Sequence, residues 1–347
     1  MTAPLLRVQG LVKTFPAGSG LLDRRVVHAV SGVDFEVQPG EILAVVGESG
    51  SGKSTLGRCL LRLVEPSAGR IVFDELDVTA VSGRALREFR RQAQPVFQDP
   101  FSSLDPRWPI ARTIREALDA YAVGRAADRE RRVDELLDLV GLPRSLRLRR
   151  PQSLSGGQRQ RVAIASALAL APRLIVADEP VSALDVSVQA QILNLFVRLR
   201  ELLGLTIVFI AHDLAVVEHL ADRVAVMYLG RIVEIGPTAR VFGIPEHPYT
   251  RALLAAIPHP DPGLRLPPQQ LRGEIPNPID PPPGCRFNPR CPVAIARCSV
   301  EVPALAEFGP GHWAACHVAL AARDAAAAVP VALSVTGKAS LSGSAEL

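Results

Sequence analysis

The chain has 347 residues, of which 48% are hydrophobic and 21% are charged, and its formal net charge is +4 at pH 7. This balance excludes wholesale disorder and predicts a globular protein with one large core or two smaller ones. The basic residues are mostly scattered arginines without a helix-length basic run, so nucleic acid is not an expected partner. The N-terminus lacks a signal peptide's apolar core, and every apolar run is too short to span a membrane. We therefore expect a cytosolic protein.

The first segments predict an antiparallel sheet. Residues 5–15 and 33–37 alternate or cluster like strands, and a loop rich in Gly, Ser and Arg separates them at 16–25. Phe15 ends the first strand, where an aromatic ring packs either on a nucleotide base or into the core. Both alternatives for Phe15 stay open.

A glycine-rich loop follows an apolar, β-rich run at 42–46. The pattern G-x-x-x-x-G-K-[ST] is matched by Gly47, Glu48, Ser49, Gly50, Ser51, Gly52, Lys53, Ser54 and Thr55. Glycines allow close backbone approach, and the helix that starts near Lys53 adds the positive end of its dipole, so this loop predicts a phosphate site. Lys53 would contact the β- and γ-phosphates, and the Ser54 hydroxyl would bind Mg²⁺.

Mixed α/β structure is expected after the loop. The predicted elements are a helix at 56–64, a strand at 70–73, a helix at 84–91 and a short strand at 95–97 that runs into a proline-closed loop. From 108 to 141, apolar residues recur at helical spacing. These helices lie between two pieces of the α/β core, so we expect a helical subdomain at about 100–160 that rotates as a unit.

A second anion-binding helix start is predicted at Ser155, Gly156, Gly157 and Gln158, just before the helical run at 162–171. Ser155 can cap the helix, and the two glycines expose its first N–H groups. An ordinary cap with flexible glycines is the alternative.

Two carboxylates follow the next apolar strand, at 174–178. Asp178 would face the phosphate loop at the carboxyl edge of a parallel sheet and hold Mg²⁺ through water. Glu179 would lie beside the γ-phosphate, where a carboxylate can orient and deprotonate the attacking water.

Four further elements are predicted near the end of the core. They are a helix at 186–203 after a cap at 182–185, a strand at 205–211, a hairpin of strands at 224–228 and 231–235, and a helix at 247–257. His212 follows the strand at the position that would deliver a side chain to the γ-phosphate.

Taken in order and spacing, these motifs resemble the nucleotide-binding subunit of an ABC transporter. The motifs are Gly47–Thr55, Gln98, Leu154–Gln158, Leu174–Glu179, Ser182–Asp185 and His212. The segments 247–254 and 273–276, with Cys285 and its neighbours, resemble the oligopeptide/dipeptide importer subfamily in particular. The fold expected is an α/β P-loop domain with an antiparallel β subdomain, a helical subdomain and a small C-terminal extension.

The resemblance implies an ATPase made of two such subunits, paired head to tail. ATP on Lys53 of one subunit would be closed over by Ser155, Gly156, Gly157 and Gln158 of the other. By similarity, Glu179 is the catalytic base, His212 contacts the γ-phosphate and Asp185 crosses the dimer interface. Gln98 would contact Mg²⁺ and link the site to the helical subdomain.

The partners implied are two transmembrane permease subunits at the cytoplasmic face of the membrane, a second ATPase subunit and, indirectly, a substrate-binding protein. The expected function is ATP-driven peptide uptake. Uptake of nickel or another small solute is an alternative, as is a soluble ABC-type ATPase outside transport. Whether the second ATPase subunit is another copy or a related chain stays open.

The predicted domains are the ATPase at 1–257, a Pro-rich linker at 258–283, a Cys-containing extension at 284–320 and a disordered tail at 321–347. Four of the five cysteines are Cys285, Cys291, Cys298 and Cys316. Shared metal ligation explains this clustering in a reduced protein, and the wide spacing together with the resemblance favours a [4Fe–4S] cluster. A zinc site that includes His312 or His317 is the alternative.

Overall fold

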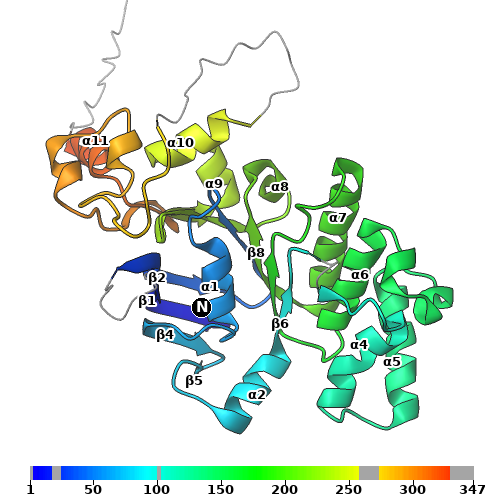
Figure 1. The fold of residues 1–347 in the computed structure, drawn as a ribbon. Helices are drawn as coiled ribbons and strands as arrows, with labels where there is room; N and C mark the ends of the chain where they lie inside the picture. Colours follow the sequence, from blue (N-terminus) through cyan, green and yellow to red (C-terminus); the bar gives the residue numbers. More distant parts are fainter. Residues whose placement is uncertain (1–2, 18–24, 100–102, 258–272, 329–347) are drawn as a thin grey trace, which may run out of the picture.

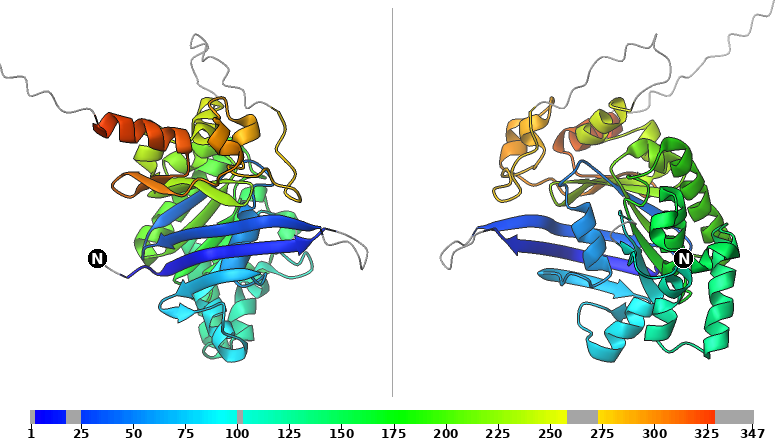
Figure 2. Two further views of the ribbon diagram at one scale, coloured as in Figure 1. Left: turned by 90° about the vertical axis from the view of Figure 1, so that its left-hand side faces the viewer. Right: turned by 45° about the vertical axis from the view of Figure 1, so that its right-hand side comes forward.

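The computed structural model describes residues 3–17, 25–99, 103–257 and 273–328. A mixed central sheet forms its middle, an antiparallel sheet lies beside it, and a group of helices lies on the other side (Figure 1). The C-terminal extension and this helical group occupy opposite sides of the core (Figures 1 and 2). The expected α/β fold, with its antiparallel and helical subdomains, is confirmed.

The central sheet has eight strands in the order β11-β12-β10-β9-β3-β8-β7-β6. They are β3 (Ile42–Val46), β6 (Ala93–Val96), β7 (Leu174–Asp178), β8 (Thr206–Ala211), β9 (Arg223–Tyr228), β10 (Arg231–Pro237), β11 (Ala306–Gly309) and β12 (His312–Ala314). β3 pairs in parallel with β8 and β9, and β7 pairs in parallel with β6 and β8. Because parallel strands end at one edge, the residues after β3, β6, β7 and β8 gather there.

The second sheet has the order β2-β1-β4-β5 and is antiparallel, as predicted. Its strands are β1 (Leu6–Pro16), β2 (Val26–Val37), β4 (Ala68–Phe73) and β5 (Leu76–Asp77). β2 starts at Val26, earlier than the predicted 33–37. The register to β1 shifts between Val33 and Ser31, so Gly32 forms a bulge at the point where the apolar alternation of the sequence breaks.

Both faces of the central sheet are covered, which explains why every residue of β3 is buried. Ile42, Ala44 and Val46 join one core, whereas Leu43 and Val45 join a second core toward the antiparallel sheet. The covering helices are α1 (Lys53–Leu60), α2 (Gly83–Gln92), α7 (Val186–Leu203), α8 (Leu214–Glu218), α9 (Thr238–Gly243) and α10 (Pro248–Ala255). Within the described ranges, no helix is long and apolar enough to cross a bilayer.

The helical group lies between β6 and β7 in the chain, as predicted. It consists of α4 (Ile110–Ala120), α5 (Ala126–Leu139), the 3-10 helices η1 (Arg144–Leu148) and η2 (Pro151–Ser153), and α6 (Gly156–Ala167). The apolar stripe expected from helical spacing is buried: Ile114, Leu118, Val133 and Leu136 are 0–2% exposed and join the first core.

The C-terminal extension continues the central sheet rather than forming a separate unit. β12 pairs with β10 through Glu234↔Ala314 and Ile235↔Trp313, and β11 pairs with β12. Its remaining elements are η3 (Asn288–Arg290), η4 (Ala296–Ser299) and α11 (His317–Ala328). The prediction of a disordered tail from 321 is wrong up to Ala328, because α11 runs through it; the rest of that tail lies outside the described residues.

Candidate functional site

The phosphate loop surrounds the ammonium group of Lys53. This side chain is 4% exposed, and its Nζ donates to the carbonyl oxygens of Gly47 at 2.7 Å and Glu48 at 3.0 Å. Burial lowers the pKa of Lys53, although the nearby carboxylates of Glu179, Asp178 and Glu48 oppose this. A buried cation held only by carbonyl groups is suited to receive an anionic ligand.

Gly52 shows why the loop needs glycine at this position. Its φ is +102°, and a Cβ there would lie 2.0 Å from the carbonyl oxygen of Ala29. The strand β2 therefore presses against the loop from the antiparallel sheet. Any side chain at this position would displace the loop from the start of α1.

The predicted magnesium ligands are neighbours. The Ser54 hydroxyl donates to Oδ1 of Asp178 at 2.8 Å, which places the end of β7 against the start of α1. Asp178 is 9% exposed, and burial raises its pKa, with the neighbouring charge of Glu179 adding to the rise. A hydroxyl and a carboxylate at this edge are oxygen ligands that suit Mg²⁺, so the donor set fits the ion.

Glu179, Gln98 and His212 converge from the ends of three different strands. The Gln98 side-chain amide donates to Oε2 of Glu179 at 3.0 Å, and Nδ1 of His212 lies 3.7 Å from the same oxygen. Glu179 has a φ of 44°, which is uncommon for a residue other than glycine, and its N–H donates to Ile210. This backbone turns the carboxylate out of β7 toward the loop.

A cavity of about 430 Å³ joins these groups. It is lined by Phe15, Val27, Ala29, Ser49, Gly50, Gly52, Lys53, Ser54, Thr55, Gln98, Glu179 and Pro278. Phe15 lies in the cavity wall, a place that stacking on a nucleotide base would require, and Lys13 Nζ lies 4.7 Å from its ring centroid. That it stacks on a base stays a prediction.

The second predicted anion site does not share this cavity. Among the described residues that line it, none comes from Ser155–Gln158 or from Asp185. Ser155 caps α6 through a reciprocal capping box with Gln158, so the expected cap is confirmed. Ser155 and Asp185 are both exposed. They are free to contact a second protein chain.

Two residues to which the sequence motifs give no role support the phosphate loop. The Tyr249 hydroxyl accepts a hydrogen bond from the N–H of Glu48 at 2.9 Å, and the Arg290 guanidinium contacts both carboxylate oxygens of Glu48, at 2.7 and 3.1 Å. These contacts span 201 and 242 residues of sequence. No local spacing could have revealed them, because the partners meet only in the folded chain.

His247 predicts a pH-dependent stability. It is 1% exposed, its Nδ1 accepts from the N–H of Tyr249, and burial lowers its pKa from 6.5 to about 4, against the opposing charge of Glu234. Between pH 6.5 and about pH 4, His247 binds a proton in the unfolded chain but not in the folded chain. Stability is therefore complete above pH 6.5 and falls as the pH drops toward 4, by about 3 kcal/mol.

Replacing His247 with Asn keeps a cap acceptor and removes the titration. In urea unfolding at several pH values, the variant should show a shallower loss of stability between pH 6.5 and 4 than the original chain. If the unfolding free energies of the variant and the original chain fell equally between pH 6.5 and 4, His247 would not be the group that titrates.

The four clustered cysteines lie in one neighbourhood. Burial raises the pKa of Cys285 to about 11, and the other three thiols add to the rise. Gly284 has a φ of +67°, and a Cβ there would lie 2.4 Å from the carbonyl of Cys298, so glycine allows these two segments to touch. In the part of the chain that the structure describes, however, no three His, Cys, Asp or Glu side chains are arranged to hold a metal ion. The geometry does not support the predicted cluster.

The mixed zinc site is not supported either, because both histidines have other partners. Nε2 of His312 lies 2.7 Å from Oε1 of the buried Glu234, and Nε2 of His317 lies 3.0 Å from the carbonyl oxygen of Glu301.

Comparison with known proteins decides the family. The chain matches the ABC transporter model over residues 30–182 and the model of the oligopeptide/dipeptide transporter C-terminal region over 233–298. A putative peptide import ATP-binding protein of Brucella ovis is 52% identical over 313 residues, which cover 90% of this chain and 97% of that protein. The chain belongs to the ATP-binding subunits of ABC transporters. This ABC ATPase is also 47% identical to the putative oligopeptide transport ATP-binding protein YkfD of Bacillus subtilis, over 91% of this chain and 95% of that one.

Solved structures agree with this assignment. The dimeric, post-hydrolysis ATP-binding cassette MJ0796 bound to ADP and Pi matches with a TM-score of 0.60 and 29% identity, covering 67% of this chain and 98% of that one. CbiO1 of Clostridium perfringens, part of the ABC transporter complex cbiONQ, matches with a TM-score of 0.62 and 31% identity, over 70% of this chain and 92% of that one. The ABC ATPase therefore binds ATP with Mg²⁺ and couples its hydrolysis to transport.

Proposed function

We propose that this ABC ATPase energises the uptake of oligopeptides or dipeptides through a separate membrane permease. The observation that carries the substrate class is the match of residues 233–298 to the C-terminal region of oligopeptide/dipeptide transporters. The relatives named above as peptide or oligopeptide ATP-binding proteins support the same class. Those residues include α10 and the start of the extension, which contact the phosphate loop through Tyr249 and Arg290, respectively.

Each site residue has a proposed task that its position permits. Lys53 and the loop N–H groups hold the phosphates of ATP. Ser54 and Asp178, which already touch, hold Mg²⁺. Glu179 takes a proton from the attacking water, and His212 donates to the γ-phosphate.

The Gln98 amide donates to Glu179, so this glutamine would orient the carboxylate and sense the metal. It follows β6 directly, at the point where the chain enters the helical group. A rotation of that group would therefore move Gln98 relative to Glu179.

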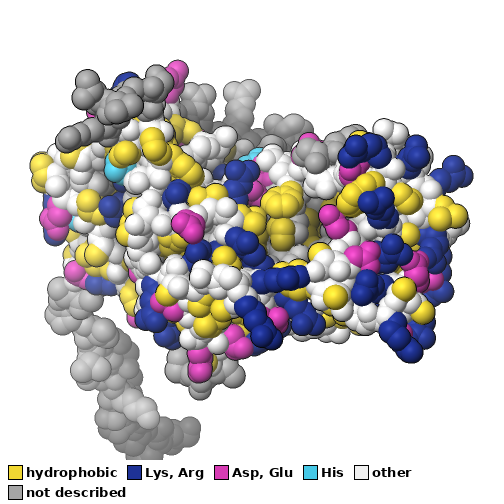
Figure 3. All heavy atoms as spheres, turned by 60° about the horizontal axis from the view of Figure 1, so that its bottom comes forward, with side chains coloured by type: hydrophobic (Ala, Val, Ile, Leu, Met, Phe, Trp, Pro, Cys, Tyr) yellow, Lys and Arg dark blue, Asp and Glu magenta, His cyan; other side chains and the backbone are white. Residues whose placement is uncertain are grey.

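Two chains complete each ATP site in this proposal. None of the described residues that line the cavity is Ser155, Gly156, Gly157, Gln158 or Asp185. The dimeric cassette that resembles this chain supports their use across an interface. Two permease subunits at the cytoplasmic face of the membrane would bind the remaining surface. Figure 3 shows a group of hydrophobic side chains near the middle of one face, with Lys and Arg side chains beside and below it. Phe97, next to Gln98, is 40% exposed.

Uptake assays test the substrate class. Cells that lack this chain should lose uptake of a radiolabelled dipeptide or oligopeptide, and the original chain should restore it, whereas Lys53→Ala should not. Nickel uptake should be unchanged. Loss of nickel uptake with normal peptide uptake would favour the small-solute alternative, and normal uptake of both would favour an ATPase outside transport.

We propose separately that Cys285, Cys291, Cys298 and Cys316 hold a [4Fe–4S] cluster, with Zn²⁺ as the alternative. The support is that the four thiols are neighbours: burial raises the pKa of Cys285, and the other three thiols add to the rise. Among the described residues they are not arranged as metal ligands, so binding would require them to draw together. When bound, either group would cross-link segments of the extension that bury little core of their own.

Metal analysis distinguishes the alternatives. Protein purified without oxygen should contain about four irons and four sulfides per chain. Cys291→Ser should lose both, whereas Cys59→Ala, which removes a buried cysteine of α1, should keep them. One equivalent of zinc in a colourless protein would reject the cluster and leave the ATPase assignment unchanged.

A further inference from the structure

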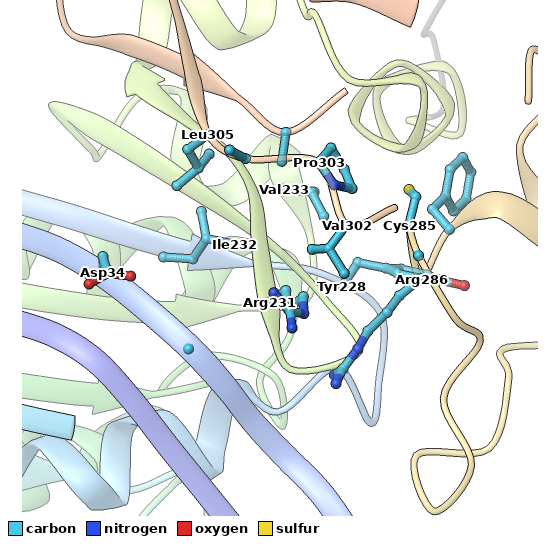
Figure 4. Close-up of a pocket in the computed structure, with 15 residues that line it drawn as sticks. Asp34, Tyr228, Arg231, Ile232, Val233, Cys285, Arg286, Val302, Pro303 and Leu305 are labelled. Carbon is cyan, nitrogen blue, oxygen red and sulfur yellow. The ribbon is translucent and has the colours of Figure 1, made fainter. Parts of the chain in front are cut away.

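A cavity of about 460 Å³ lies where the central sheet meets the C-terminal extension. Its walls come from β2, from β10 and from two segments of the extension, near Cys285 and Val302 (Figure 4). It shares no lining residue with the nucleotide cavity. None of the catalytic tasks proposed above uses it.

Arg231 is a cation in this wall for which the described residues supply no partner. It begins β10, and its Nε is buried with no hydrogen-bond partner. Neither Arg231 nor Arg286 forms an ion pair within the described residues. Burial lowers the pKa of Arg231, because the charged guanidinium group is less stable away from water.

Arg286 supplies a second positive charge from the facing segment of the extension. Its Nη1 donates to the carbonyl oxygen of Leu229, and burial with the nearby charge of Arg231 lowers its pKa to about 10. Arg286 therefore remains charged at neutral pH. Arg231 is also a cation there, because a guanidinium group keeps its proton in proteins. Figure 4 shows their side chains in the same part of the cavity, approaching from different segments.

The other ionisable groups of the wall do not neutralise this pair. Asp34 is exposed, and its Oδ1 accepts from the N–H of Gly10 at 2.7 Å. Tyr228 and Cys285 both have raised pKa values because of burial, so they are uncharged. The wall thus carries the positive charges of Arg231 and Arg286 and one negative charge, that of Asp34, which is exposed and bonded to Gly10.

The rest of the wall is largely apolar. Ile232 and Val233 face it from β10, and Val302, Pro303 and Leu305 close it from the extension (Figure 4). An inorganic anion would satisfy the two guanidinium groups and leave these side chains against water. A carboxylate with an apolar body satisfies both parts of the wall.

We propose that this cavity binds a small aliphatic carboxylate, with its carboxyl group between Arg231 and Arg286 and its apolar body against Ile232, Val302 and Leu305. The guanidinium fork matches a carboxylate in two parallel hydrogen bonds. Bound ligand would supply the missing partner of Arg231 and remove the repulsion between the two arginines.

A matched pair of probes tests the charge requirement. Full-length protein, saturated with Mg-ADP to fill the phosphate loop, is titrated calorimetrically with 4-methylpentanoate, with 4-methylpentanamide, and with inorganic phosphate at equal ionic strength. We expect binding of the carboxylate, and at least about tenfold weaker binding of the amide and of phosphate. Equal affinity for carboxylate and amide, preference for phosphate, or no binding of the carboxylate would overturn the proposal.

Arg231→Gln is the cleaner variant, since the side chain of Arg231 forms no hydrogen bond with the described residues, whereas Arg286→Gln also removes the bond to Leu229. Arg231→Gln should weaken carboxylate binding at least about tenfold. Without ligand it should unfold at no lower temperature than the original chain, because it removes a partly buried charge that has no partner among the described residues. Arg84→Gln, on exposed α2, should change neither quantity. Unchanged affinity of Arg231→Gln, or its marked destabilisation without ligand, would contradict the assignment.

Discussion

Replacing Glu179 with Gln should lower ATP turnover by about 10²–10⁴-fold while ATP binding is retained. The carboxylate lies in the wall of the nucleotide cavity, its Oε2 accepts from Gln98, and His212 is 3.7 Å away. Glutamine keeps the size and the hydrogen-bonding capacity of the side chain but cannot take a proton from water. The loss should therefore appear in kcat rather than in the affinity for ATP.

The Glu179 variant should also accumulate as an ATP-bound dimer, because two chains close over nucleotide that they cannot hydrolyse. Steady-state turnover, equilibrium ATP binding, and molecular mass with and without ATP measure the three expectations. Glu201→Gln, the same change at an exposed position of α7, is the control and should retain normal turnover. Turnover at the original rate in the Glu179 variant would show that this carboxylate is not the base.

Replacing Arg290 with Met should destabilise the chain by about 3 kcal/mol and raise KM for ATP. The Arg290 side chain is 5% exposed and forms a bidentate ion pair with Glu48 of the phosphate loop, whose side chain is 24% exposed. Removing the guanidinium leaves a partly buried carboxylate without its partner. The extension would then release the loop segment that precedes Lys53.

A double variant separates the ion pair from packing. Arg290→Met combined with Glu48→Gln removes both charges, so it should cost less than the sum of the two single variants. Arg7→Met is the control, because it breaks an exposed ion pair with Glu36 and should cost less than about 1 kcal/mol. Urea unfolding of the original chain and of the four variants gives the change in unfolding free energy for each variant. Coupling between the extension and the loop would be excluded by either of two results. The loss of stability in the double variant would equal the sum of the two single losses, or Arg290→Met would lose no more stability than Arg7→Met.

Local patterns carried the identification of the site. The loop from Gly47 to Thr55, the cap at Ser155 and the carboxylates that end β7 each occupy a few consecutive residues. Their geometry follows from backbone rules that act over one turn or one strand. Strands that alternate with helices pair in parallel, and parallel pairing brings Asp178, Glu179 and His212 to the same edge. For this reason the expected α/β fold and the convergence at the loop are present in the structure.

The extension was predicted less well, because its structure depends on contacts with distant residues. β12 is a strand because β10 offers it an open edge, and α11 extends to Ala328 through a segment whose composition is that of a tail. Four clustered cysteines indicated a metal site, yet spacing along the chain does not determine whether thiols meet in ligand geometry. The described residues show neighbouring thiols without that geometry.

The sequence by itself determined that this protein has a phosphate loop, two carboxylates and a histidine in the order of an ABC ATPase, since each motif is local. Only the tertiary structure decided what supports and surrounds them. Gly52 is required because β2 approaches to within 2.0 Å of the position of its absent Cβ. Glu48 is held by Arg290, 242 residues away, and Arg231 finds no partner in the described part of the chain, beside a largely apolar cavity. Such contacts arise from packing between segments remote in sequence, where no periodicity or spacing records which side chains will meet.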